Sequence, residues 1–403
     1  MHLFKDPKVR SAVAIGTLCS SSYLGVYIAR NILSAVTPQI VESGLYTNEY
    51  IGRVSSLFFM FYACGQLING FIGNRVKARY MISFGLILAG LCNALFPLLL
   101  AHETAAQLTC GMIGFFLAMI YAPMTKVVAE NTEPIYATRC SLGYTFASFL
   151  GTPLAGVLAS LFAWQTVYSV SSAALLVMGA LCFAIFLHFE RTGVVRYGQY
   201  KAQAKGALKL KVLIEHRIVK FTLISIITGV VRTAVVFWLP TYIAQYLGFP
   251  TQTAAGVFTV TTFIISMTTF VAVFLYERLG RDMDLTIFVG FTASAIAFLA
   301  VFFIKQPVLN IILLVIAIMS SNIAASMLFS RYCPSLRDTG MVSSATGFID
   351  FVSYMAAGLS TTLFANAVAQ IGWGKLILVW FALVAVGALI SIPRRGRRTP
   401  GAK

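Results

Sequence analysis

The chain has 403 residues, of which 59% are hydrophobic and only 11% are charged, and its mean hydropathy is +0.84. A transmembrane helix needs roughly 20 apolar residues, so this composition is sufficient for about twelve spans. It excludes a soluble globular enzyme, a disordered chain and a disulfide scaffold. The formal net charge of +17 does not indicate a nucleic-acid-binding protein, because such proteins carry their basic residues on a water-exposed face.

Apolar runs predict twelve membrane spans in an all-α membrane protein. In chain order they lie near residues 11–41, 50–73, 80–100, 106–129, 138–162, 165–189, 218–246, 252–276, 284–304, 307–330, 341–369 and 374–392. The first run is too long for a cleavable signal peptide. The seven cysteines lie almost all in apolar runs and form no CxxC pair. We therefore interpret them as packing residues and expect no metal or other cofactor.

The distribution of basic residues predicts the orientation of the chain. Twelve spans place both termini on one side of the membrane, and the loops on that side hold 24 of the 30 Lys and Arg residues. The opposite loops hold three. By the positive-inside rule, both termini are predicted to be cytoplasmic.

An internal repeat divides the chain into two halves. The predicted parts are a six-helix half over 1–190, a basic cytoplasmic linker over 191–216, a second six-helix half over 217–393 and a basic tail over 394–403. Three landmarks repeat at offsets of 202 to 204 residues: Arg30 and Pro38 with Arg232 and Pro240, Asn74-Arg75 with Glu277-Arg278, and Gly143 with Gly347. Duplicated halves are typical of transporters whose site lies at the membrane midplane between the halves.

Two arginines at matching positions inside the membrane indicate an anion site. An arginine at the centre of a span costs at least roughly 2.5–3.5 kcal/mol, and Arg30 and Arg232 both lie deep in their spans. Their symmetry predicts that they face one cavity, where they repel each other unless an anion lies between them. A phosphate accepts bidentate hydrogen bonds from each guanidinium. The alternative is that each arginine is structural and binds helix carbonyls.

Other polar residues of the spans extend this prediction. Tyr23, Tyr27 and Arg30 share one helical face, and Tyr62 on the second span is expected to join them; an aromatic packing stripe is the alternative. Lys126 either extends the basic lining or snorkels to the interface. Asp350 and Tyr354 lie one turn apart. Three roles are open to Asp350: pairing with an arginine, binding a substrate hydroxyl, or carrying a proton.

At these residues the chain resembles the organophosphate:phosphate antiporter family of the major facilitator superfamily. The resemblance rests on 23-YLGVYIARN-31, 232-RTAVVFWLPTY-242 and 347-GFIDFVSY-354, and on 70-GFIGNRVKAR-79, which is typical of the cytoplasmic gating loop of the superfamily. It implies the major facilitator fold, alternating access and inorganic phosphate as counter-substrate. It also implies a phosphate-binding role for Arg30, Arg232, Tyr23, Tyr27 and Tyr62.

The chain departs from this family at several positions. Glycerol-3-phosphate members have a lysine where this chain has Gln66 and a histidine where it has Leu150, and the tyrosine one turn before the seventh-span arginine is Gly229. Sugar-phosphate members place an acid in the eleventh span, as this chain does with Asp350, although they usually add a lysine one turn later, where this chain has Ser353. A sugar phosphate is therefore slightly favoured as substrate.

The sequence thus predicts a monomeric antiporter of the bacterial inner membrane that exchanges a sugar phosphate or glycerol phosphate for phosphate. Its expected partners are this anionic substrate, inorganic phosphate and the lipid bilayer, with no nucleic acid. An enzyme is not expected, because no nucleophile–base pair, metal-ligand spacing or glycine-rich phosphate loop is present. Two alternatives stay open: a proton-coupled organic-anion symporter that uses Asp350, and a transporter-like sensor of a sugar phosphate.

Overall fold

The computed structural model describes residues 7–44, 46–72, 76–198, 216–336 and 342–393. Several sequence predictions concern residues outside these ranges: Asn74 and Arg75 of the repeat, most of the basic linker, and the basic tail. In the described ranges every regular element is a helix. This agrees with the apolar composition, because a helix satisfies its backbone hydrogen bonds internally where no water is available.

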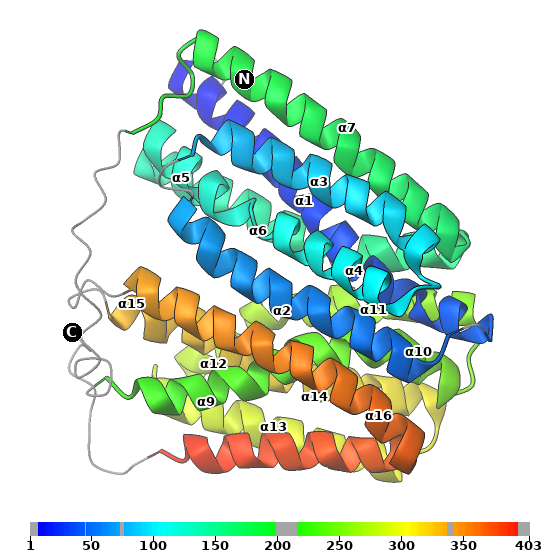
Figure 1. Ribbon diagram of the computed structural model, residues 1–403. Helices are drawn as coiled ribbons and strands as arrows, with labels where there is room; N and C mark the ends of the chain where they lie inside the picture. Colours follow the sequence, from blue (N-terminus) through cyan, green and yellow to red (C-terminus); the bar gives the residue numbers. More distant parts are fainter. Residues whose placement is uncertain (1–6, 45, 73–75, 199–215, 337–341, 394–403) are drawn as a thin grey trace. The chain divides into compact units, whose positions relative to one another are not determined.

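The helices follow the predicted spans closely (Figure 1). Their bounds are α1 Pro7–Glu42, α2 Asn48–Ile72, α3 Ala78–Leu99, α4 Glu103–Leu117, α5 Tyr121–Asn131, α6 Pro134–Leu161, α7 Trp164–Arg191, α9 Ile218–Gly229, η2 Val230–Val235, α10 Val236–Gln245, α11 Thr251–Ser266, α12 Thr268–Arg278, α13 Met283–Phe303, α14 Pro307–Met327, η3 Leu328–Tyr332, α15 Cys333–Ser335 and α16 Val342–Ser391. Proline stands in the first turn of α6 and α14, where its missing N–H costs nothing.

The described residues form eleven helical stretches that are long and apolar enough to cross a membrane. The last of them contains two of the predicted spans, because α16 comprises two helices that meet at a kink, over 50 residues in all. At 1.5 Å per residue, this length is about two and a half times the thickness of a bilayer core. Its backbone leaves the helical conformation at Gly372, with φ 74° and ψ 166°. The break lies between the two spans that the sequence separates at 370–373.

Four spans consist of more than one helical piece. The fourth is α4 followed by α5, the seventh is α9, η2 and α10, the eighth is α11 and α12, and the tenth is α14, η3 and α15. Both η2 and η3 are π-helical, each with one arginine, Arg232 and Arg331. Such π-helical insertions occur frequently at functional sites.

The outer surface of the described helices is apolar. Leu98, Phe303 and Leu389 are each about two-thirds or more exposed, whereas polar side chains such as Asn93 and Asn310 are fully buried. Asn93 donates to Ser172 Oγ at 3.1 Å, and Asn310 donates to the carbonyls of Val301 and Ile304. A surface of this kind needs a lipid environment.

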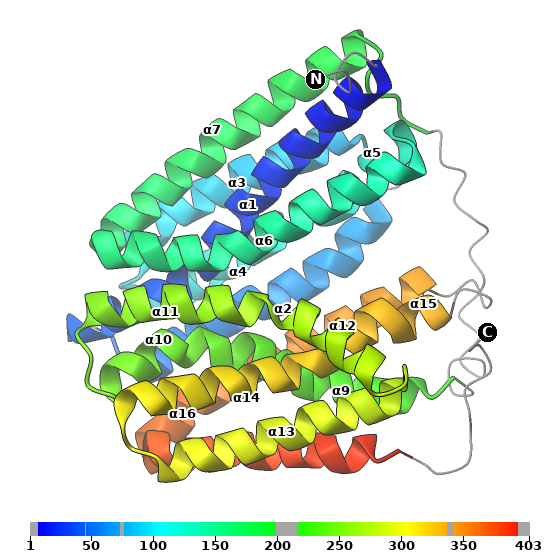
Figure 2. The ribbon, with the colours of Figure 1, turned by 180° about the vertical axis from the view of Figure 1, so that it is seen from behind.

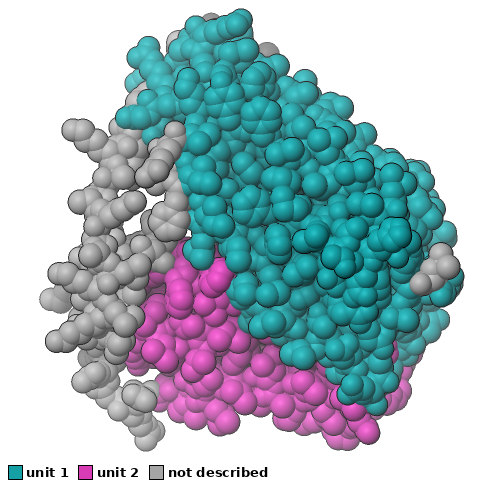
Figure 3. All heavy atoms as spheres, in the orientation of Figure 1, with its two compact units in different colours: residues 1–205, 233–266, 354–370 teal, residues 206–232, 267–353, 371–403 magenta. Residues whose placement is uncertain are grey.

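The chain forms two compact units (Figure 3). Unit 1 contains residues 1–205, 233–266 and 354–370, and unit 2 contains 206–232, 267–353 and 371–403. This division by packing is a different one from the division of the sequence by its repeat, which stays a prediction.

Unit 1 combines α1 to α7 with segments from the second half of the sequence. Within it α3 packs beside α7, and α11 packs beside α6 (Figure 2). Ser34 Oγ of α1 donates to the carbonyl of Phe237 at 2.6 Å, and Thr362 Oγ1 of α16 donates to the carbonyl of Gly52 at 3.0 Å. The Trp238 indole donates to the carbonyl of Thr361 at 3.1 Å. These bonds hold α10 and the middle of α16 against the first helices of the chain.

Unit 2 is built on the packing of α13 against α14. At one end of it, Asp284 accepts from Arg217 Nη1 at 2.7 Å and from Lys220 Nζ at 3.1 Å. The Tyr332 hydroxyl donates to the carbonyl of His216 at 3.1 Å. Aromatic packing of Phe298 on Trp380 joins the last part of α16 to α13. These contacts join the start of α9 and the last part of α16 to the pair formed by α13 and α14.

Candidate substrate-binding site

Arg30 of α1 lies in a group of tyrosines within unit 1. Its guanidinium carbon is 4.7 Å from the ring centroid of Tyr354, 4.9 Å from that of Tyr62 and 5.4 Å from that of Tyr27. Arg30 Nη1 also donates to the Tyr354 hydroxyl at 2.9 Å. The rings of Tyr62 and Tyr354 are buried and meet edge to face. The sequence predicted the grouping of Arg30 with Tyr27 and Tyr62, and the structure adds Tyr354 directly to it.

The Arg30 guanidinium contacts these neutral aromatic groups, and it forms no ion pair with a carboxylate among the described residues. A cation–π contact contributes about 0.5–2 kcal/mol, whereas removing a charge from water costs several kcal/mol. The tyrosines therefore offset only part of the cost. An anion that accepts hydrogen bonds from the guanidinium offsets more of it.

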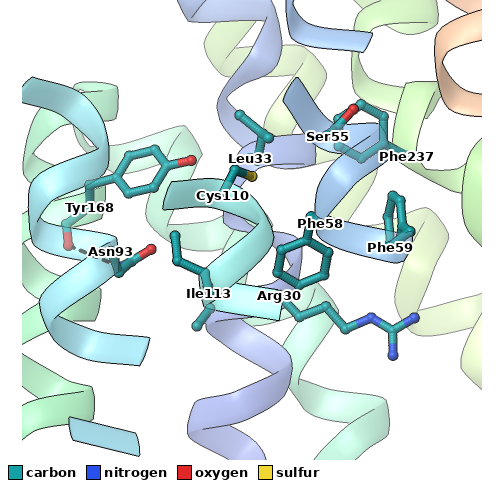
Figure 4. Close-up of a pocket in the computed structure, with 11 residues that line it drawn as sticks. Arg30, Leu33, Ser55, Phe58, Phe59, Asn93, Cys110, Ile113, Tyr168 and Phe237 are labelled. Carbon is teal, nitrogen blue, oxygen red and sulfur yellow. Dashed lines mark hydrogen bonds between the residues drawn. The ribbon is translucent and has the colours of Figure 1, made fainter. Parts of the chain in front are cut away.

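The space beside Arg30 is small. A cavity of about 10 Å³ is lined by Arg30, Phe58, Asn93, Tyr168 and Phe237, among others (Figure 4). This is about the space that one water molecule needs. In the close-up the Arg30 stem runs past Phe58 and its guanidinium is directed away from Asn93 and Tyr168. The guanidinium itself contacts Tyr27, Tyr62 and Tyr354.

The aromatic cluster is larger than the sequence indicated. Tyr23 contacts Tyr27 with ring centroids 5.0 Å apart, and it also contacts Tyr121 of α5 at 5.5 Å and Tyr144 of α6 at 6.2 Å. Tyr121 and Tyr144 pack on each other as well. No pattern in the sequence indicated these two tyrosines, because only the packing of α5 and α6 brings them to α1.

Neighbouring residues fix the position of this cluster. Gly151 of α6 lies against Tyr27, and a Cβ atom at this position would collide with the tyrosine. A hydrogen bond joins the Gln66 side chain to Tyr62, one turn away on α2. Gln66 is one of the positions at which the chain departs from the resemblance, and here it contacts the tyrosine cluster.

Arg232 has a different environment in unit 2. Its Nη2 lies 3.7 Å from Asp350 Oδ1 of α16, and its guanidinium carbon lies 5.7 Å from the ring centroid of Phe329. The side chains of Arg232 and Asp350 are 32% and 21% exposed, so solvent partly screens the pair. Pairing with an arginine is one of the three roles that the sequence left open for Asp350. Phe329, in η3, carried no signal in the sequence.

Two departures from the family pattern lie against each other beside this ion pair. Gly229, at the end of α9, packs on the backbone and side chain of Ser353 so closely that a Cβ atom there would overlap them. A tyrosine at 229 therefore does not fit this packing, and neither does a long side chain directed from 353 toward α9. The close packing at this point therefore requires a small residue at both 229 and 353.

The remaining candidates are placed as follows. Lys126 lies on α5, half-buried, five residues after Tyr121. Asp350 and Tyr354 lie one turn apart on α16, as predicted, but they contact different arginines. Tyr354 bonds to Arg30 within unit 1, and Asp350 pairs with Arg232 within unit 2.

Long apolar helices, with the half-buried arginines Arg30 and Arg232 among them, are the features of a multi-pass membrane protein. The sequence pattern of the Major Facilitator Superfamily matches residues 19–361, which is most of the chain. The chain therefore belongs to the Major Facilitator Superfamily.

Characterised relatives confirm the resemblance to the organophosphate:phosphate antiporter family. The chain is 22% identical to the membrane sensor protein UhpC of Salmonella typhimurium over 402 residues, which cover 92% of this chain and 87% of the relative. It is 22% identical to the phosphoglycerate transporter protein of the same organism, with coverage of 93% and 87%. These relatives are membrane transport and sensor proteins, and neither is an enzyme.

Solved structures show the same fold. The crystal structure of a D-xylose-proton symporter matches with a TM-score of 0.75 at 14% identity, covering 94% of this chain and 97% of that one. A bacterial homologue of the human lysosomal transporter Spinster matches with a TM-score of 0.73, also at 14% identity, covering 94% and 96%. These likenesses establish the major facilitator fold.

Proposed function

We propose that this transporter exchanges a phosphorylated metabolite, a sugar phosphate or glycerol phosphate, for inorganic phosphate across the bacterial inner membrane. The observation that carries the proposal is the environment of Arg30, a cation deep in α1. Its hydrogen bond and its cation–π contacts are made with neutral tyrosines. A phosphoryl dianion compensates this charge and accepts several hydrogen bonds from the guanidinium and the neighbouring hydroxyls.

Each candidate residue has a role in the proposal. Arg30 and Arg232 bind the phosphoryl group, and the tyrosines donate hydrogen bonds to it while they separate it from lipid. Asp350 binds a hydroxyl of the organic part of the substrate when Arg232 turns to the phosphoryl group, and Lys126 attracts anions from the cytoplasm. The complete set is Arg30, Arg232, Tyr23, Tyr27, Tyr62, Lys126, Asp350 and Tyr354.

The proposed cycle is alternating access by a monomer with two six-helix halves and cytoplasmic termini. A bound anion lowers the repulsion between basic residues, which favours the closed intermediate that must form before the transporter reorients. In the empty transporter no bound anion lowers this repulsion. Exchange of one phosphorylated anion for another is therefore expected to be faster than net transport.

Uptake of radiolabelled phosphate into proteoliposomes tests this proposal. We expect uptake into vesicles preloaded with phosphate and little into empty vesicles. Competition by glycerol-3-phosphate, glucose-6-phosphate and 3-phosphoglycerate then identifies the organic substrate. Equal uptake into empty vesicles under an imposed pH gradient contradicts exchange and supports a proton-coupled symporter.

A sensor is the second candidate, because one relative that spans most of this chain is itself a membrane sensor protein. A sensor binds a sugar phosphate and transmits the signal to a partner. The two candidates differ in one measurement: a sensor binds glucose-6-phosphate in detergent solution but does not move labelled phosphate or glucose-6-phosphate into preloaded vesicles.

A further inference from the structure

A second hollow in unit 1 is lined by residues of α1 and α7 and by none of the tyrosines of the cluster. It has a volume of about 470 Å³, which is within the roughly 300–1,000 Å³ of small-ligand sites. The side chains that line it are Ala14, Thr17, Leu18, Ser21, Met178, Leu181, Ile185 and Phe189. We call this hollow the α1–α7 groove. None of its residues belongs to the proposed transport site.

The two helices contribute different kinds of side chain to the groove. On α1 its lining residues are mostly small, which leaves space above the helix, and on α7 they are large and apolar. The two helices touch beside the groove, where Ser22 Oγ and Cys182 Sγ lie 3.0 Å apart. Leu181 is 48% exposed, so the groove opens on the outer, apolar surface of the helices. In a membrane this surface faces lipid.

Basic residues lie at one end of the groove, near the start of α1 and the end of α7. Arg10 is exposed and stands one turn before Ala14 on the same face of α1. On the α7 side, Arg191 and Arg196 are also exposed, and the Arg196 guanidinium lies near Gly193. His188 is exposed one turn after Ile185.

Two acidic residues that the structure describes near this end, Glu190 and Glu133, are paired with other groups. Glu190 accepts from Arg79 Nη1 at 2.9 Å and from the Tyr197 hydroxyl at 3.0 Å. Burial and the neighbouring Glu190 carboxylate raise the pKa of Tyr197, so its hydroxyl stays a donor in this pair. Glu133 accepts from Lys8 at 2.8 Å. Among the described residues, the unpaired charge at the open end of the groove is therefore basic.

We infer that the α1–α7 groove binds one anionic phospholipid of the cytoplasmic leaflet, with an acyl chain in the groove and the phosphate at Arg10. A phosphodiester accepts a bidentate pair of hydrogen bonds from a guanidinium, and basic pockets between helices on the cytoplasmic side bind anionic headgroups. The charge at the open end favours this lipid over an apolar helix of a partner protein. The inference uses the proposed cytoplasmic termini and does not depend on phosphate exchange.

Native mass spectrometry of the purified full chain tests the inference. The protein is titrated with dioleoyl-phosphatidylglycerol and, separately, with dioleoyl-phosphatidylcholine. We expect one phosphatidylglycerol to bind tightest, with a preference over phosphatidylcholine of about five-fold for each basic residue that the headgroup contacts. Arg10→Gln should lower this preference by about five-fold, and Ala14→Phe, which fills the groove, should remove the tight binding of both lipids.

Two matched variants control for general effects. Arg139→Gln removes an exposed arginine at the start of α6, and Val13→Phe adds the same ring on an exposed face of α1 outside the groove lining. Both should bind phosphatidylglycerol like the unchanged chain. Equal losses in Arg10→Gln and Arg139→Gln, or unchanged binding in Ala14→Phe, would overturn the inference. The inference would also be overturned if the unchanged chain were a dimer that Ala14→Phe dissociates, because a second copy of the chain would then occupy the groove.

The lipid measurement and the transport measurement test the lipid site and the proposed function independently. Lipid binding is read without any phosphorylated substrate, and phosphate exchange is read in the same preparation after reconstitution. Selective lipid binding without exchange contradicts only the proposed function. Exchange without selective lipid binding contradicts only the lipid site.

Discussion

At the scale of single residues, the two intramembrane arginines differ in how their charges are balanced. Arg30 contacts the faces of tyrosines and donates to one hydroxyl, whereas Arg232 forms an ion pair with Asp350 at 3.7 Å. A phosphoryl group can approach Arg30 by displacing a neutral hydroxyl. At Arg232 it must compete with a carboxylate. In the proposed function, Asp350 therefore competes with anions for Arg232.

Asp350→Asn should raise the affinity for inorganic phosphate. The substitution keeps the shape of the side chain but removes the charge that occupies Arg232, and a partly exposed ion pair contributes roughly 1 kcal/mol or less. We expect the KM for phosphate exchange to fall by a few-fold, while the preference for a hydroxyl-bearing organic phosphate over phosphate decreases. Exchange kinetics with both substrates measure this change.

Asp282→Asn provides the control for this charge change, because Asp282 caps the start of α13, where asparagine caps as well. Its KM should equal that of the unchanged chain. A higher KM for phosphate in Asp350→Asn would contradict the competitor role. Loss of accumulation driven by a pH gradient in that variant would instead support proton transport by Asp350.

At the scale of elements, the seventh span is shaped by one π-helical turn and one glycine. The segment η2 contains Arg232, and Gly229 directly precedes it at the end of α9. Gly229 allows the backbone of α9 to approach Ser353 of α16. This close approach places Asp350, one turn before Ser353, on the part of α16 that faces Arg232.

Gly229→Ala should destabilise unit 2. The added Cβ atom overlaps the Ser353 backbone, which cannot move without displacing α16, and overpacking of this kind costs about 1–3 kcal/mol. We expect a melting temperature in detergent that is lower by several degrees. Gly347→Ala is the matched control, because a Cβ atom there meets nothing within 4 Å on the same helix α16. Equal melting temperatures for the two variants would contradict the packing argument.

The sequence predicted most elements but not their interruptions. Long apolar runs specify the spans, and the i, i+4, i+7 spacing of Tyr23, Tyr27 and Arg30 specifies a face, because both are local properties of one helix. The π-helical turn at Arg232 is different: it arises from packing, and no proline or glycine within η2 marks it. The contact of Arg30 with Tyr354 joins residues 324 positions apart, so it depends on the packing of α16, which spacing does not predict.

At the scale of the whole molecule, unit 1 joins segments from both halves of the sequence. Asn48, at the start of α2, donates to Gln245, at the end of α10, at 2.8 Å, and Thr251 donates to Glu42 at 2.8 Å. These residues lie at the helix ends on the side that the charge distribution places opposite the termini. Alternating access requires that such contacts separate during each cycle.

Cross-linking α2 to α10 should therefore stop transport. We expect the pair Asn48→Cys and Gln245→Cys, joined by a short cleavable thiol reagent in a Cys64→Ser background, to lose phosphate exchange and to recover it after cleavage. Cys64 is replaced because it is the exposed native cysteine. The control pair, Arg53→Cys and Glu103→Cys, joins α2 to α4 within the first half of the sequence. Exchange that continues in the cross-linked test pair would contradict the proposed separation.

The central claim is that Arg30 binds the transported phosphoryl group, and exchange of phosphate by Arg30→Lys tests it most directly. Lysine keeps the charge but not the planar fork, so it cannot form the bidentate bond. A charge-assisted hydrogen bond contributes about 1.5–3 kcal/mol, and we expect exchange in phosphate-loaded vesicles to fall at least about tenfold. Arg53→Lys, at an exposed ion pair with Glu103, should exchange normally. Near-normal exchange by Arg30→Lys would contradict the account.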